Sequence, residues 1–473
     1  MQGRRKEEES SALREKRVCG DAGDGGFEDR CRDAGDGIGR DAGKDGCSDV
    51  GKDSCSDIGD GECDGAGRDL GDDEDAHEDA YEDRKDLEIE EEFRIWRKNV
   101  PYLYDMFLSH VLAWPSLTVE WFPDAIRNEE SETTTQRVLL GTHTAGQEEE
   151  YLQIVGITLP DTVCDASLKS REDGGYGFGE SKVKVLQKIP VKKEINRARC
   201  MRGNSSIIAV RTDLPEVAIY DYTKHASFPK EAAPNMVLEG HTAGGYGLLW
   251  HPVKDGVLTT SGYDGLICTF DVASGPTPAG VIKEKEEIND ISLSVFGEML
   301  AVGTEKAGTI IIDKRDGSRK VLDSGETLCS QFSLDSPNVL ATGSKDGSAR
   351  VWDLRNERAP IHVLSVHKDE VVQVQWSPHF EHVLATAGRD RRVNVWDLSK
   401  AGEAQTEEEK EEGPPELLFV HGGHIDALAD ICWNPHEPWE IASVGDDNTL
   451  QVWQLSAGVA PDPEEASDEK NGQ

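Results

Sequence analysis

A histidine, an aspartate and a hydroxyl side chain recur together at fixed spacing in the second half of the sequence. Three times a histidine precedes an aspartate by 23 residues, a serine or threonine stands four residues before that aspartate, and an aromatic residue follows it by six. These sets are His241, Thr260, Asp264 and Phe270; His367, Thr386, Asp390 and Trp396; and His424, Ser443, Asp447 and Trp453. A fourth place keeps Thr342, Asp346 and Trp352 but has Asp323 instead of the histidine. Because serine, histidine and aspartate also form the triad of many hydrolases, the sets have two interpretations.

Repetition separates these two interpretations. A catalytic triad is needed once, at one cleft, whereas a set that recurs at a regular period is typical of equivalent structural units. In such a unit the aspartate orients the histidine, the histidine meets the hydroxyl, and the hydroxyl accepts the indole N–H, so buried polar groups are satisfied. The sequence also lacks GxSxG, HExxH and GxxxxGK[ST] motifs. We therefore predict no catalytic residues, no metal site and no cofactor.

The period of the repeat predicts the fold. Pairs that end strands occur at Tyr220-Asp221, Phe270-Asp271, Ile312-Asp313, Trp352-Asp353, Trp396-Asp397 and Trp453-Gln454. Their spacings of 50, 42, 40, 44 and 57 residues bracket the roughly 40–45 residues of one four-stranded WD40 blade. Residues 116–160 contain strand patterns for one more blade. We predict an all-β protein, a seven-bladed WD40 β-propeller whose first and last blades join so that no sheet edge stays open.

An amphipathic helix is expected before the propeller. Ile89, Phe93 and Trp96 follow the i, i+4, i+7 spacing of one helical face. Pro101 disfavours helical geometry at the preceding residue, so the helix should end near Asn99, with a second short helix from Leu103 to His110. The apolar face either covers the propeller or forms one wall of a groove, and both roles are compatible.

Composition and charge divide the remaining chain. Residues 1–86 are rich in Gly, Asp and Glu and carry a net charge of −14, so we predict disorder there and at 458–473. Between these tails lie a helical segment at 87–110 and the propeller at 111–457. The formal charge of −41 disfavours nucleic acids as ligands and favours basic partners. Since no apolar run reaches the roughly 18 residues of a membrane span, and Met1 to Val18 lacks a secretory signal, neither membrane association nor secretion is expected.

The longest interval between strand-ending pairs contains an acidic loop at 401–416. Its carboxylates are Glu403, Glu407, Glu408, Glu409, Glu411, Glu412 and Glu416. A charge run is usually a solvated loop. Here, however, Leu417 to Val420 follow at once, and an apolar wall beside an acidic rim suits a basic amphipathic helix lying in a groove.

Several stretches together resemble a known family. They are Glu92 to Asp105, Trp114 to Thr118, Asn196 to Arg199, Gly245 to Trp250, His367 to His379 and Gly413 to His424. They look like the retinoblastoma-binding-protein and MSI-like family of WD40 histone-binding proteins, which includes the small subunit of chromatin assembly factor, over about 87–455. The resemblance implies a non-enzymatic nuclear subunit that holds histones for chromatin assembly, deacetylase, acetyltransferase, remodelling or Polycomb complexes.

The resemblance also implies two binding sites. The first helix of histone H4 would lie between the N-terminal helix and the acidic loop, and the residues of this groove would be Leu103, Glu409, Glu411, Glu412, Phe419 and Val420. The tail of histone H3, or a similar basic peptide, would bind the top rim of the propeller at Trp114, His143, Glu194, Asn196, Tyr246, Glu370 and Asp446. Gly244, Asn289 and Val372 depart from the family pattern, which predicts an altered rim. A generic WD40 scaffold, such as a ubiquitin-ligase substrate receptor, is the alternative, but it needs neither the helix motif nor the acidic loop.

Overall fold

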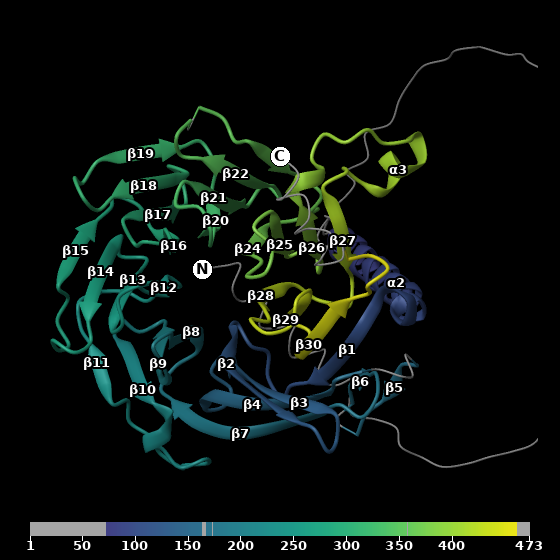
Figure 1. Ribbon diagram of the computed structural model, residues 1–473, viewed down its shortest axis with the longest axis horizontal. Coiled ribbons are helices and arrows are strands. Elements are labelled where there is room, and N and C mark those ends of the chain that lie inside the picture. Colours follow the sequence, from purple (N-terminus) through teal and green to yellow (C-terminus); the bar gives the residue numbers. More distant parts are fainter. Residues whose placement is uncertain (1–71, 163–166, 173, 357, 461–473) are drawn as a thin grey trace, which may run out of the picture. The chain divides into compact units, whose positions relative to one another are not determined.

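The computed structural model describes residues 72–162, 167–172, 174–356 and 358–460. These residues form seven antiparallel sheets that are arranged as the blades of a ring (Figure 1). Each blade has four strands, and the last blade carries two further short strands. The seven-bladed propeller predicted from the spacing of strand-ending pairs is therefore confirmed.

The first four blades follow one another along the chain. Blade 1 consists of β2 (Val119–Asn128), β3 (Thr133–Gly141), β4 (Glu150–Pro160) and β7 (Lys182–Val191). Blade 2 consists of β8 (Ile195–Met201), β9 (Asn204–Thr212), β10 (Val217–Asp221) and β11 (Met236–Leu238). Blade 3 consists of β12 (Leu248–Trp250), β13 (Val257–Ser261), β14 (Leu266–Asp271) and β15 (Gly280–Lys283). Blade 4 consists of β16 (Ile288–Leu293), β17 (Met299–Thr304), β18 (Thr309–Asp313) and β19 (Arg319–Leu322).

The last three blades include the region of the acidic loop. Blade 5 consists of β20 (Thr327–Phe332), β21 (Val339–Ser344), β22 (Ala349–Asp353) and β23 (His362–Leu364). Blade 6 consists of β24 (Val371–Trp376), β25 (Val383–Gly388), β26 (Val393–Asp397) and β27 (Leu417–His421). Blade 7 consists of β28 (Leu428–Trp433), β29 (Glu440–Gly445), β30 (Thr449–Leu455) and β1 (Tyr104–Val111), followed by β6 (Tyr176–Gly177) and β5 (Lys169–Ser170). The helices are α2 (Asp72–Leu103) and α3 (Glu407–Glu412), with 3₁₀ turns η1 (Tyr222–Lys224) and η2 (Leu398–Lys400).

The strand β1 closes the ring. It pairs antiparallel with β30, with Leu108 opposite Val452, so a segment that precedes blade 1 completes blade 7. The expected closure is confirmed, but the second short helix predicted from Leu103 to His110 is wrong. Phe107 and Leu108 are neighbours in the sequence and both are fully buried, which requires apolar surroundings on both faces of a strand.

The helix α2 is longer at both ends than predicted. It passes through Pro101 and ends at Leu103 rather than near Asn99, because a proline in the last turn removes only one backbone hydrogen bond of the helix. It begins at Asp72, within the segment expected to be disordered; from there to Val100 the sequence has no glycine or proline, and its first turn is acidic. The expected tails at 1–71 and 461–473 lie outside the described residues. No helix in the described part of the chain is long and apolar enough to cross a membrane.

The predicted His–hydroxyl–Asp sets form hydrogen-bonded networks inside the blades. In blade 6, His367 lies 2.7 Å from Thr386 and 2.9 Å from Asp390, and the Trp396 indole donates to Thr386 at 2.9 Å. The same contacts join His424, Ser443, Asp447 and Trp453 in blade 7, and His241, Thr260 and Asp264 in blade 3. In blade 5, where histidine is missing, the Arg350 guanidinium occupies the carboxylate of Asp346 at 2.7 Å, and Trp352 still donates to Thr342 at 3.1 Å.

The hydroxyl of Thr386 has more partners than that of Thr342, and the two threonines form a matched pair for a stability test. Thr386→Val leaves both the Trp396 indole and the His367 imidazole without a partner, at about 1–3 kcal/mol for each buried polar group. Thr342→Val affects only the Trp352 indole. We therefore expect Thr386→Val to lower the free energy of unfolding more than Thr342→Val in urea titrations. Equal losses would contradict a stabilising role for the histidine contact.

Candidate functional site

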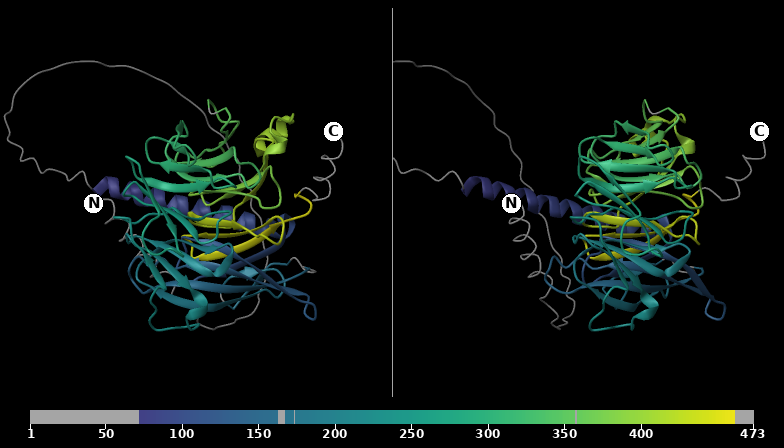
Figure 2. Two further views of the ribbon diagram at one scale, coloured as in Figure 1. Left: turned by 60° about the vertical axis from the view of Figure 1, so that its left-hand side comes forward. Right: turned by 90° about the vertical axis from the view of Figure 1, so that its left-hand side faces the viewer.

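One face of α2 is anchored to blades 6 and 7. Val100 is fully buried and Trp96 is 9% exposed, and both pack in a cluster with Tyr104, Phe107 and residues of the two blades. The N-terminal part of the helix extends past the sheets (Figure 2). The apolar face therefore covers the propeller, as one of the two expected roles requires.

A chain of hydrogen bonds reinforces this anchor. The Trp96 indole donates to the Tyr104 hydroxyl at 3.0 Å, and that hydroxyl lies 2.8 Å from Nδ1 of His421, whose Nε2 lies 3.1 Å from Oε1 of Gln451. Burial, and to a smaller extent His424, hold the pKa of His421 well below its usual value, so the imidazole is neutral. Because the amide oxygen of Gln451 can only accept, Nε2 carries the hydrogen, and Nδ1 accepts the hydroxyl hydrogen of Tyr104.

The hydroxyl of Tyr104 is the centre of this chain, and its removal should loosen α2. Tyr104→Phe leaves Trp96 and His421 unpaired in a buried site, so we expect a loss of about 1–3 kcal/mol in the free energy of unfolding. We also expect faster amide hydrogen exchange along the segment that includes Trp96 and Val100. The control is Tyr102→Phe, because the Tyr102 side chain is 80% exposed. Unchanged exchange in Tyr104→Phe would show that the apolar contacts alone hold the helix.

The acidic segment expected as a loop contains the short helix α3. The Thr406 hydroxyl and the Glu409 carboxylate form a reciprocal capping box, in which Glu409 accepts the backbone N–H of Thr406 at 2.7 Å. This hydrogen bond lowers the pKa of Glu409. Gln405 donates to the carbonyl of Gly413 at 3.0 Å and closes the base of the segment. The carboxylates of Glu411 and Glu412 remain exposed.

The strand β27 lies between α3 and α2 (Figure 1). Phe419 is only 7% exposed and packs against Tyr104 and Trp453, so it belongs mainly to the core. Leu418 and Leu103 are half-buried at the edge of the same cluster. Of the residues expected to contact a ligand, Leu103 and Val420 thus keep more accessible apolar surface than Phe419.

Two apolar side chains of α2 escaped the sequence analysis. Ile95 and Tyr102 are 51% and 80% exposed. At about 100° per residue, both lie within about 80° of Glu92, which contacts blade 6, and far from Arg97, which lies over Tyr176 of β6. They therefore occupy the flank of α2 that faces β27 and α3. Their seven-residue spacing was the available signal, but it differs from the phase of the buried face.

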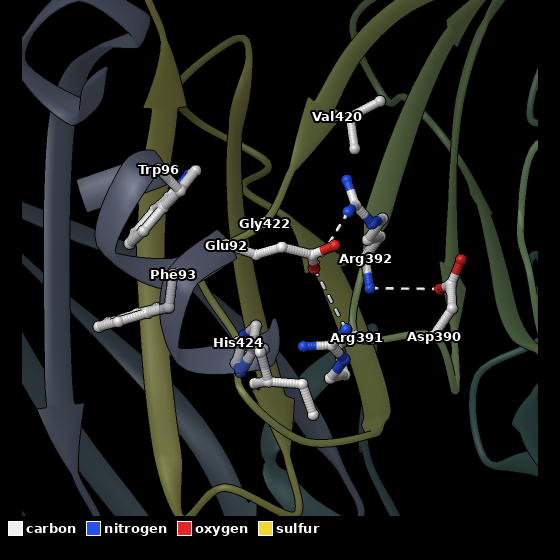
Figure 3. A pocket seen from close by; sticks show the side chains of 10 residues that line it. Glu92, Phe93, Trp96, Asp390, Arg391, Arg392, Val420, Gly422 and His424 are labelled. Atoms are coloured by element: carbon white, nitrogen blue, oxygen red, sulfur yellow. Dashed lines mark hydrogen bonds and ion pairs between the residues drawn. The ribbon is translucent and has the colours of Figure 1, made fainter. Parts of the chain in front are cut away.

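A cavity of about 120 Å³ lies where α2 meets blade 6 (Figure 3). It is lined by Ile89, Glu92, Phe93, Trp96, Asp390, Arg391, Arg392, Val420, Gly422 and His424. The Glu92 carboxylate bridges the guanidinium groups of Arg391 and Arg392 at 3.3 and 3.4 Å. Together with the acidic α3, these features form a side groove with an apolar floor, which we call the α2–α3 groove.

The residues expected at the top rim are only partly brought together. Tyr246, Glu370 and Asp446 line one cavity of about 340 Å³, together with Asn289 and Val372. Trp114, His143, Glu194 and Asn196 do not line this cavity.

Internal partners already occupy several of these rim residues. Glu370 is paired with Arg389 at 2.9 Å and lies 4.0 Å from Lys345. Asn196 is almost fully buried, and its amide donates to Asp213 at 2.9 Å. A basic peptide at the rim would therefore have to compete with cations of the protein itself.

The ring of blades, its recurring tetrads and the groove on its side define a WD40-type β-propeller scaffold. A family model that describes the histone-binding protein RBBP4, a component of the CAF1 complex, matches residues 91–161, which include the second half of α2 and strands β1 to β4. The model of the WD domain, G-beta repeat, matches residues 324–353, 358–397 and 415–454. The chain belongs to the RBBP4/MSI-like family of WD40 histone-binding proteins, as its sequence motifs predicted.

Proposed function

We propose that this protein is a non-enzymatic scaffold that binds the first helix of histone H4 in the α2–α3 groove. The observation that carries the proposal is the position of the acidic α3 beside the apolar strip of α2 and β27, next to the segment that matches the histone-binding family model. A basic amphipathic helix would place its apolar face on Leu103, Val420, Ile95 and Tyr102, and its cations against Glu409, Glu411 and Glu412. Phe419 would support the floor from beneath.

The wider role follows from this binding. Acting in the nucleus, the protein would present histones H3 and H4 to larger subunits of chromatin assembly, deacetylase, acetyltransferase, remodelling or Polycomb complexes. The tail of H3 would bind the top rim more weakly than the H4 helix binds the groove, because Arg389 and Lys345 already surround Glu370. A substrate receptor of a ubiquitin ligase is less well supported, since it needs neither α2 nor the acidic α3.

A titration of the full chain tests this proposal. A peptide of the first H4 helix and a peptide of the H3 tail are titrated calorimetrically at two salt concentrations, with a scrambled H4 peptide as the control. We expect the H4 peptide to bind more tightly than the scrambled peptide, and its affinity to fall at high salt because the charges are partly screened. No difference between the H4 and scrambled peptides at low salt would refute the proposal.

A further inference from the structure

Two arginines at one end of the α2–α3 groove have unused hydrogen-bond donors. Each guanidinium carries five N–H donors, yet among the described residues the side chains of Arg391 and Arg392 donate only to Glu92, at 3.3 and 3.4 Å. The neighbouring Asp390 carboxylate points elsewhere, toward His367 at 2.9 Å. Both guanidinium groups border the 120 Å³ cavity and remain partly exposed, at 23% and 34%. Oxygen acceptors from outside the protein can therefore reach them.

The cavity beside these arginines has the size of one side chain. Small-molecule sites usually occupy about 300–1,000 Å³, well above the 120 Å³ found here. Ile89, Phe93, Trp96 and Val420 give it apolar walls. An aliphatic side chain of a bound helix fits such a cavity, and a residue one helical turn away would then lie beside the guanidinium groups.

The two ends of the groove thus differ in chemistry. At the α3 end, exposed carboxylates demand cations; at the other end, an apolar cavity and two guanidinium groups demand an aliphatic side chain and an oxygen acceptor. The geometry points to a groove that is selective along its length: the bound amphipathic helix places its lysine and arginine cluster against α3, an aliphatic side chain in the cavity, and a carboxylate against Arg391 and Arg392. This inference rests on the proposed function and specifies the ligand. Glu92 holds the arginines until the carboxylate of the ligand shares them.

Three helical peptides of matched length test this selectivity. The first carries a cluster of lysines and arginines at one end and a glutamate at the other; the second replaces that glutamate by glutamine; the third moves the glutamate into the cationic cluster. We expect the first peptide to bind about three- to tenfold more tightly than either of the others, as partly exposed charge-assisted hydrogen bonds allow.

Variants of the protein locate the effect. Arg391→Gln combined with Arg392→Gln should abolish the preference for the first peptide, whereas Arg97→Gln, on the opposite flank of α2, should preserve it. Equal affinity of the native protein for the three peptides, all above a scrambled control, would overturn this inference and leave the groove itself intact. No binding of any of them above the scrambled control would overturn the proposed function together with the inference.

Discussion

Replacing Glu409, Glu411 and Glu412 together by lysine is expected to lower the affinity for the H4 helix by about 100-fold at low salt. Exposed ion pairs contribute up to about 1 kcal/mol each, so three of them amount to about 3 kcal/mol, and each 1.4 kcal/mol is about tenfold in affinity. The loss should shrink as salt rises, because exposed charges are screened over a Debye length of about 10 Å at 0.1 M. Calorimetric titration at low and high salt measures both effects.

A matched variant separates the site from the overall charge. Glu129, Glu130 and Glu132 are exposed in the hairpin between β2 and β3, and their replacement by lysine changes the net charge equally. That variant should keep at least most of the affinity. A further variant, Glu409→Gln, retains the capping box of α3, since glutamine serves at this position, and so separates loss of charge from loss of the helix. Equal losses in the α3 and hairpin variants would indicate nonspecific charge attraction.

Replacing Asp430 by alanine is expected to cause the largest loss of stability, about 3–5 kcal/mol, because it leaves a charge buried without its partner. Asp430 lies in blade 7 and accepts the backbone N–H of Val119 at 2.9 Å, the amide of Gln373 at 2.7 Å and the guanidinium of Arg199 at 3.1 Å. These residues belong to blades 1, 6 and 2, so one carboxylate joins four blades. Its side chain is only 1% exposed.

The control for Asp430 is a carboxylate in a surface ion pair. Asp313 pairs with Arg315 at 2.6 Å, and the arginine is 63% exposed, so Asp313→Ala should cost at most about 1 kcal/mol. Asp430→Asn keeps an oxygen acceptor and should fall between the two alanine variants. Urea unfolding followed by tryptophan fluorescence gives all three free energies. A cost of Asp430→Ala no larger than that of Asp313→Ala would contradict the role assigned to this carboxylate.

Features that depend on period could be predicted from the sequence, whereas features that depend on distant pairing could not. The spacing of Trp352, Trp396 and Trp453 carried the blade count, because each blade repeats the same local requirements. The strand β1 was mistaken for a helix because its partner, β30, lies at the opposite end of the propeller sequence. Likewise, the indole of Trp433 donates to the carbonyl of Gln375 in the neighbouring blade, a contact that no local pattern reveals.

The candidate site was predicted in part for similar reasons. The acidic run at α3 and the apolar residues after it are contiguous, so their proximity was visible in the sequence. Arg391 and Arg392 lie in a turn between strands that also carries a tetrad aspartate, and nothing in the sequence indicated that Glu92, about 300 residues earlier, contacts them. Burial of Phe419 depends on the packing of Tyr104 and Trp453, which also come from distant segments.

Hydrogen exchange of the full chain with and without the H4 helix peptide tests the central claim most directly. Occupation of the α2–α3 groove should slow exchange of backbone amides in the segment from Ile89 to Leu103 and in β27. The loops that carry Tyr246 and Glu370 at the top rim should be unchanged. Protection confined to the rim loops, with none in α2 or β27, would contradict the claim that the groove holds the histone helix.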